Sequence, residues 1–197
     1  MTDHAAPFSV DGYRGLLPLA VTGGVAEGKT TVVGYLRELG LNCLSADDVA
    51  RSVWDKPDVQ ATLASTLGAR LPLDRAAVLR EVAEDPAKRR EVNRILHPEI
   101  LNRLMSSGAQ VVEIPLLVES CLQGLFRRVW VVTCGAEEQL SRLSARLGDE
   151  ALARQLIDTQ LASEVKCVFA DEIVRTNQPP FTVHSEVVSL ARACGFV

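Results

Sequence analysis

The sequence predicts an α/β fold in which a parallel five-stranded sheet is covered by helices on both faces. Short apolar runs, typical of strands buried on both faces, alternate along the 197 residues with segments of helical periodicity. The first apolar run leads directly into a G-x-x-x-x-G-K-T pattern, and a helical segment follows it. This order of strand, glycine-rich loop and helix is that of a P-loop NTPase-type fold.

The glycine-rich loop is the first candidate site. Its candidate nucleotide-binding residues are consecutive: Gly23, Gly24, Val25, Ala26, Glu27, Gly28, Lys29, Thr30 and Thr31. Backbone N–H groups of such a loop converge on a polyphosphate at the helix N-terminus, the lysine reaches the phosphates, and the threonine hydroxyl is a ligand for Mg²⁺. The alternative is a glycine turn that begins a helix beside a solvated lysine. We expect the Lys29 ammonium to be accessible to solvent without nucleotide.

The remaining elements follow in order along the chain. Strands are expected at Leu16–Thr22, Asn42–Leu44, Gln110–Ile114, Val129–Thr133 and Glu172–Val174, with helices at Ala136–Leu147, Asp149–Gln160 and Thr182–Ala193. Residues 1–15 read as a loose arm before a single domain that spans residues 16–197. Residues from about 148 to 167 carry Arg154 and Lys166 and suit a mobile lid.

An all-helical insertion is expected at about residues 56–107. Helical periodicity recurs there in three pieces, Val59–Leu67, Arg75–Val82 and Pro86–Met105, and no strand pattern interrupts them. Asp74 and Asp85 are the expected N-caps of the second and third pieces. His97-Pro98 should kink or divide the third piece. The insertion suits either a lobe that covers a substrate or a purely structural lobe.

Composition excludes several classes of protein. A hydrophobic content of 47% can supply a sizeable core, and a net charge of −4 offers no broad attraction to nucleic acid or to an anionic membrane. The five cysteines are widely spaced without a C-x-x-C pair, so neither a disulfide framework nor a zinc site is indicated. No export signal and no apolar run of membrane-spanning length is visible, so a cytoplasmic location is expected.

Asp47 has two interpretations. It follows the second predicted strand in the stretch Ser45-Ala46-Asp47-Asp48, which opens a helix. In one interpretation Ser45 and Asp48 form a capping box, and Asp47 only complements the helix dipole. In the other, a carboxylate just beyond the carboxyl end of a parallel strand accepts a proton from a substrate hydroxyl.

Three further candidates also have structural alternatives. Glu113 lies inside a predicted buried strand, where an acid suits either the Mg²⁺ role of a Walker B carboxylate or a structural ion pair. Arg142 and Arg146 share one face of a predicted helix with Gln139, which suits either nucleotide contacts or a solvated surface. His97, alone in a helical segment, is either structural or catalytic.

The chain resembles the dephospho-coenzyme A kinase family from about Leu17 to its C-terminus. The ordered matches are Thr22-Gly23-Gly24, Ala46-Asp47 with Ala50-Arg51, Leu96-His97-Pro98, Pro115-Leu116-Leu117 with Glu119, Gln139-x-x-Arg142-x-x-x-Arg146, Gln160, Lys166, Ala170-Asp171 and Asn177. The sequence departs from the usual family pattern at Ala26-Glu27, where glycine and serine are usual, and at Ser45, Glu113 and Val118.

The resemblance implies transfer of the γ-phosphoryl group of ATP, with Mg²⁺, to the ribose 3'-hydroxyl of dephospho-CoA. It implies catalytic roles for Lys29, Asp47 and Arg142, with Asp47 as the base, and nucleotide contacts from Arg142 and Arg146. Implied substrate-binding residues are Asp47, Arg51, His97, Leu116, Arg154 and Lys166, and the implied metal site contains Thr30 and Glu113. The helical insertion would bind the CoA moiety. Other small-metabolite or nucleoside monophosphate kinases, and a regulatory nucleotide-binding protein without catalysis, are the alternatives.

Overall fold

The computed structural model describes residues 15–197, so the predicted N-terminal arm lies almost wholly outside the described residues. The described chain divides into two compact units. Ala46–Gly108 forms a helical unit, and residues 15–45 together with 109–197 form an α/β unit. The helical unit therefore begins at Ala46, earlier than the insertion predicted from about residue 56.

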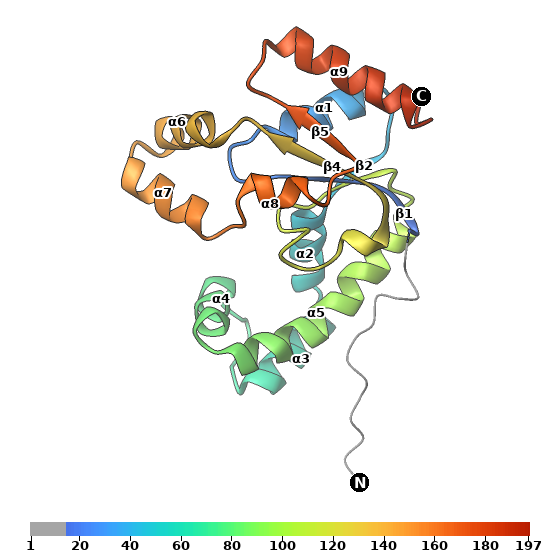
Figure 1. Ribbon diagram of the computed structural model, residues 1–197. Coiled ribbons are helices and arrows are strands. Elements are labelled where there is room, and N and C mark those ends of the chain that lie inside the picture. Colours follow the sequence, from blue (N-terminus) through green and yellow to red (C-terminus); the bar gives the residue numbers. More distant parts are fainter. Residues whose placement is uncertain (1–14) are drawn as a thin grey trace. The chain divides into compact units, whose positions relative to one another are not determined.

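A five-stranded parallel sheet lies at the centre of the α/β unit (Figure 1). Its strands are β1 (Leu17–Thr22), β2 (Cys43–Ser45), β3 (Val111–Glu113), β4 (Phe126–Thr133) and β5 (Glu172–Arg175). They are ordered β2-β3-β1-β4-β5, and every neighbouring pair is parallel. The predicted fold class is confirmed, and β1 is central. The loop that follows β1 therefore opens between the carboxyl ends of β3 and β4.

The main core of this unit lies between the sheet and two helices, α1 (Lys29–Glu38) and α9 (Pro180–Ala193). Alternate strand residues point into it, among them Leu19, Val21 and the fully buried Trp130. Val32 and Leu36 from α1 and Val183 and Val187 from α9 complete the cluster. Ala20 and Val131, which alternate with the core residues along their strands, are also buried, so both faces of the sheet are covered.

Three helices lie between β4 and β5 along the chain: α6 (Ala136–Leu147), α7 (Glu150–Asp158) and α8 (Ser163–Cys167). Asp149 begins α7, because its side chain accepts a hydrogen bond from the N–H of Leu152 at 3.0 Å. Helix α6 packs against α7, and α8 packs against β4. The short α8 and a 3-10 turn, η2 (Gln123–Leu125), have no counterpart in the sequence prediction.

The helical unit contains α2 (Ala46–Trp54), α3 (Pro57–Leu67), α4 (Arg75–Glu84) and α5 (Pro86–Ser106), and α5 packs against the other three. The predicted N-caps are confirmed: Asp74 accepts from the N–H of Ala76 at 2.9 Å, and Asp85 accepts from the N–H of Ala87 at 2.8 Å. Trp54, at the end of α2, is 5% exposed, and the guanidinium of Arg75 lies 5.9 Å from its ring centroid.

His97-Pro98, predicted to kink or divide the third helical segment, does not divide it. Helix α5 runs unbroken from Pro86 to Ser106 with Pro98 inside it. Proline removes one backbone donor from a helix, and packing of α5 against three neighbouring helices offsets that loss. Among the helices that the structure describes, none is long and apolar enough to span a membrane.

Candidate active site

The loop between β1 and α1 has glycine where the backbone requires it. Gly23 has a φ of 149°, and a Cβ at this position would lie 2.2 Å from the carbonyl oxygen of Val132 on β4. Gly28 has a φ of 90°, and a Cβ there would lie 3.1 Å from the side chain of Thr176. These two residues let the loop pass close to the ends of β4 and β5, so only glycine fits at either position without a shift of its neighbours.

Ala26 adopts the same left-handed region without being glycine. Its φ is 61°, one of two positive values among the described residues other than glycine. An L-residue pays a steric penalty for this conformation, and the surrounding loop holds it in place. Ala26 therefore holds a strained conformation that glycine would adopt without this penalty.

Lys29 lies at the start of α1 and is 8% exposed. Its ammonium donates a hydrogen bond to the carbonyl oxygen of Gly24 at 2.7 Å. The expectation that this ammonium would be accessible to solvent is wrong, because the side chain folds back and its ammonium binds the backbone of the loop at Gly24. The ammonium nevertheless stays against the backbone of the loop, and its phosphate contact remains a prediction.

Thr30 and Glu113 come together although 83 positions separate them. The Thr30 hydroxyl and one carboxylate oxygen of Glu113 lie 3.4 Å apart, because β3 pairs with β1 and ends beside the loop. Both are the hard oxygen donors that Mg²⁺ prefers. Among the described residues no group of three or more His, Cys, Asp or Glu could hold a metal. A site of two protein oxygens still fits Mg²⁺, which keeps several waters and binds substrate phosphates.

Helix α6 presents Gln139 and Arg142 to the loop region. The Gln139 amide donates to the carbonyl oxygen of Val25 at 3.0 Å. The Arg142 guanidinium donates to the backbone carbonyl of Thr176 at 2.8 Å and to the Glu138 carboxylate at 2.7 Å. Thr176 in turn donates its hydroxyl to the carbonyl oxygen of Glu27 at 2.7 Å. Arg142 is therefore connected to the phosphate loop by hydrogen bonds through Thr176.

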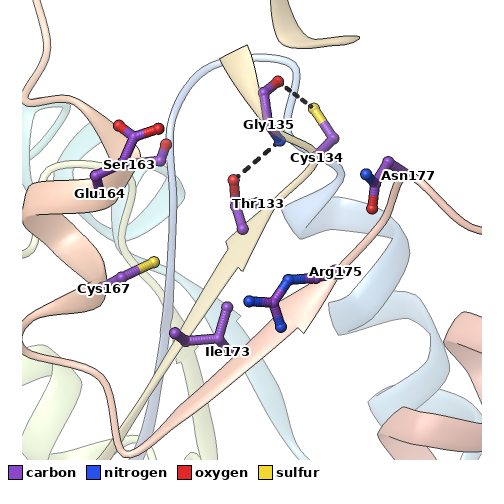
Figure 2. A pocket seen from close by; sticks show the side chains of 9 residues that line it. All are labelled: Thr133, Cys134, Gly135, Ser163, Glu164, Cys167, Ile173, Arg175 and Asn177. Atoms are coloured by element: carbon purple, nitrogen blue, oxygen red, sulfur yellow. Dashed lines mark hydrogen bonds between the residues drawn. The ribbon is translucent and has the colours of Figure 1, made fainter. Parts of the chain in front are cut away.

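Two of the hollows in the α/β unit lie beside the phosphate loop or the ends of the neighbouring strands. One of about 310 Å³ lies beside the end of the loop and is lined by Gly28, Thr31, Tyr35, Arg142, Thr176, Gln178, Pro180 and Val183. The other, of about 390 Å³, opens at the carboxyl ends of β4 and β5 beside α8. Figure 2 shows its lining, which includes Thr133, Ser163 and Arg175. Ligands of α/β proteins bind at this end of the sheet.

Comparison with known proteins agrees with this geometry. The family model for dephospho-CoA kinase matches residues 17–179. A dephospho-CoA kinase of Carboxydothermus hydrogenoformans is 38% identical over 179 residues, which cover 81% of this chain and 85% of the relative. The chain belongs to the dephospho-CoA kinase family.

Further relatives extend the same likeness. The dephospho-CoA kinase of Escherichia coli K12 is 30% identical over 188 residues, which cover 87% of this chain and 90% of the relative. A crystal structure of TT1252 from Thermus thermophilus has a TM-score of 0.78 at 25% identity and covers 90% of this chain and 96% of that one. As a member of a kinase family, the chain is an enzyme that uses ATP.

In this member of the dephospho-CoA kinase family, the other predicted site residues of the α/β unit differ in their exposure to solvent. Arg146 is exposed on the last turn of α6. Arg154 is exposed and paired with Glu150 at 2.7 Å. Leu116 is 44% exposed. The Lys166 side chain, in contrast, is fully buried, and its ammonium lies 2.8 Å from the Glu119 carboxylate. Lys166 thus has a structural partner in addition to its predicted substrate role.

The helical unit carries the remaining candidates. Asp47 lies in the first turn of α2 and is exposed. Arg51, one turn later, is paired with Asp48 at 2.9 Å. His97 is exposed by its accessible surface, yet its neighbours desolvate the ring enough to lower its pKa below the usual value. The substrate roles of these residues stay predictions.

Sequence reasoning missed several residues that contact the phosphate loop in this dephospho-CoA kinase family member. Gln139 was placed on the correct helix face but not chosen, although it lies one turn before Arg142. Gln160, whose side-chain oxygen accepts from the N–H of Val25 at 3.0 Å, was visible as a family match. Thr133, Ser163 and Thr176 carry no pattern in the sequence. Their contacts arise only when β4, α8 and the segment after β5 meet the loop.

Proposed function

We propose that this protein transfers the γ-phosphoryl group of ATP to the ribose 3'-hydroxyl of dephospho-CoA, giving CoA and ADP, the last step of CoA biosynthesis. The observation that carries the proposal is a phosphate loop whose lysine and threonine lie beside a strand-end carboxylate in a chain of this family. The Lys29 ammonium and the pair of oxygens on Thr30 and Glu113 flank one short stretch of backbone. Such an arrangement suits phosphoryl transfer, in which positioning and charge stabilisation account for most of the catalysis.

The loop and α6 would bind the nucleotide. Loop N–H groups and Lys29 would hold the β and γ phosphates. Thr30 and Glu113 would hold Mg²⁺, which supplies charge neutralisation between the phosphate oxygens. Arg142, within hydrogen-bonding distance of Thr176, would face the developing charge, and Arg146 would add a longer-range contact. The hollow that Arg142 lines together with Tyr35 would hold part of the nucleotide.

The remaining predicted residues would bind the acceptor and take its proton. Asp47 would orient and deprotonate the 3'-hydroxyl, since a carboxylate can serve as the base in phosphoryl transfer. Arg51 and His97 of the helical unit, together with Leu116, would contact dephospho-CoA. Arg154 belongs to the proposed lid at about residues 148–167, and its exposed guanidinium would bring positive charge to the transferred phosphoryl group. Lys166 lies in the same segment and would contact the substrate only from its buried position beside Glu119.

The direct test is ADP release from ATP and Mg²⁺ with a panel of acceptors: dephospho-CoA, adenosine, AMP, CMP and shikimate. We expect turnover with dephospho-CoA alone, and loss of turnover in Lys29→Ala with the melting temperature unchanged within a few degrees. Turnover with another acceptor only would make the protein a different small-metabolite kinase. Nucleotide binding without turnover on any acceptor would favour a regulatory role.

A further inference from the structure

Glu27 is a carboxylate placed inside the phosphate loop, and it is 1% exposed. One of its oxygens, Oε2, accepts a hydrogen bond from the N–H of Gly24. A loop that binds polyphosphate is an unfavourable place for a negative charge, and a buried carboxylate is costly unless donors satisfy it. The donors around Glu27 therefore decide whether this residue can be accommodated in the loop.

The other oxygen of Glu27 faces two different elements. Oε1 accepts from the hydroxyl of Thr133 at the end of β4 at 2.9 Å, and from the hydroxyl of Ser163 on α8 at 2.6 Å. Thr133 and Ser163 both line the hollow drawn in Figure 2. A single carboxylate thus bridges three parts of the α/β unit: the first turn of the phosphate loop, the end of β4 and the first residue of α8.

The segment that leads into α8 is fastened to the loop a second time. The side-chain oxygen of Gln160 accepts from the N–H of Val25 at 3.0 Å. The next residue, Leu161, donates its N–H to the Glu119 carboxylate at 3.1 Å. Residues 160–163 therefore connect α7 to the backbone of Gly24 and Val25, directly through Gln160 and through Glu27 by way of Ser163. A displacement of α8 would break the hydrogen bond from Ser163 to Glu27 and strain the one between Gln160 and Val25.

We propose that Glu27 is a positioning residue that couples α8 to the phosphate loop. Ser163 and Thr133 fix the carboxylate through Oε1, and the fixed carboxylate holds the Gly24 N–H through Oε2. The carboxylate acts through the backbone of the loop, because Oε2 accepts from the Gly24 N–H. Nucleotide affinity then depends on the position of α8, which acts on the loop through the hydrogen bond from the Ser163 hydroxyl to Glu27. The proposal rests on nucleotide binding by the loop and is independent of the acceptor.

The test is a double-mutant cycle read by equilibrium binding of ADP with Mg²⁺ to the full chain, using isothermal titration calorimetry. Glu27→Ala leaves the Gly24 N–H without its acceptor and should weaken ADP binding about tenfold, the scale of one hydrogen bond to a charged group. Ser163→Ala should weaken it about threefold, the scale of one neutral hydrogen bond. The double variant should match Glu27→Ala, because Ser163 acts only through Glu27.

Conservative and control variants separate positioning from simple stabilisation. Glu27→Gln should bind ADP within about threefold of wild type, since its amide can accept from Gly24 and donate to the two hydroxyls. Ser189→Ala, an exposed serine on α9, is the matched control and should not change ADP binding.

Two results would overturn the coupling. One is a lowered melting temperature with unchanged ADP affinity in Glu27→Ala and Ser163→Ala. The other is a double variant whose loss is the product of the two single losses. If Glu27→Ala does not fold, Ser163→Ala alone decides the test: the coupling requires weaker ADP binding than wild type, and an unchanged ADP affinity in this variant overturns it. A wild-type protein that binds ADP but does not phosphorylate dephospho-CoA would contradict the proposed function and leave this coupling intact.

Discussion

The ammonium of Lys166 lies 2.8 Å from the carboxylate of Glu119, and the lysine side chain is fully buried. The same ammonium donates to the carbonyl oxygen of Pro115 at 3.2 Å. Burial alone would raise the pKa of Glu119, but the hydrogen bond from Lys166 and those from the backbone N–H groups of Glu119 and Leu161 lower this pKa by more. The pair thus ties α8 to the chain that follows β3.

Removal of the lysine should destabilise the protein in a pH-dependent manner. Because folding lowers the pKa of Glu119 from its ordinary 4.5, the contribution of the pair is present above that pH and is lost as the pH falls through the folded value. We expect Lys166→Met to lower the free energy of unfolding by about 2–3 kcal/mol at pH 7, below the full range for buried pairs because Glu119 is partly exposed. Urea denaturation at pH 7 and pH 4 measures this loss, which should shrink at pH 4.

The exposed pair of Arg154 and Glu150 provides the control for that experiment. Both side chains are more than half exposed, so Arg154→Met should change stability by less than about 1 kcal/mol. A loss in Lys166→Met of equal size at both pH values would show that the lysine contributes packing and not charge.

Arg142 should matter more to catalysis than Arg146. Arg142 is held by Thr176 and Glu138 beside the nucleotide hollow, whereas Arg146 is exposed on the same helix. We expect Arg142→Ala to lower kcat/KM by more than about tenfold, because a charge-assisted hydrogen bond in a partly desolvated site exceeds about 1.4 kcal/mol. Arg146→Ala should lower it by a smaller factor. Steady-state kinetics measures kcat/KM for both variants, and Arg192→Ala, at an exposed position on α9, is the control. Equal losses of kcat/KM in Arg142→Ala and Arg146→Ala would contradict this order.

Asp47 and Asp48 are adjacent carboxylates with different expected roles. If Asp47 accepts the hydroxyl proton, Asp47→Asn should lower kcat by a factor on the order of 10² to 10⁴ with nearly constant affinity for ATP. If it only complements the dipole of α2, the variant should lose about 0.3–1 kcal/mol of stability and keep its rate. Asp48, which is paired with Arg51, is the matched control, and its asparagine variant should keep kcat. A kcat for Asp47→Asn within about threefold of wild type would exclude the proposed base.

Opposite substitutions in the phosphate loop should have opposite effects on stability. Ala26→Gly removes the steric penalty of a φ of 61°, partly offset by the greater freedom of glycine in the unfolded chain, so stability should rise by about 0.5 kcal/mol. Gly23→Ala places a Cβ 2.2 Å from the Val132 carbonyl oxygen and should cost about 2–3 kcal/mol. Thermal denaturation with and without ATP would detect both changes, and shifts of the same sign would refute this account.

Residues with a local signal were predicted correctly from the sequence. The apolar runs gave five parallel strands, and helical periodicity gave α6 with the bounds found in the structure, Ala136–Leu147. The start of β4 was missed because Arg127 and Arg128 interrupt its apolar pattern while still belonging to the strand. The N-caps Asp74 and Asp85 were recognised because capping depends on neighbouring residues only.

Residues whose role depends on distant neighbours were missed or misjudged. Burial of Lys29 accompanies the contact of its ammonium with the Gly24 carbonyl oxygen, and the partner of Lys166 lies 47 positions earlier in the chain. Helix α8 has five residues, too few for periodicity to reveal it. Ser163 and Thr176 are common residue types that became candidates only through the tertiary contacts of Glu27.

The protein has two tryptophans, and each unit contains one of them. Trp130 is fully buried in the core between the sheet and α1, while Trp54 is nearly buried in the helical unit beside the guanidinium of Arg75. Intrinsic fluorescence therefore has one emitter in each unit. With excitation selective for tryptophan over tyrosine, a Trp54→Phe protein emits from the sheet core alone, and a Trp130→Phe protein emits from the helical unit alone. Unfolding of the two units can thus be recorded separately, without an external dye, by following one emission spectrum in each variant.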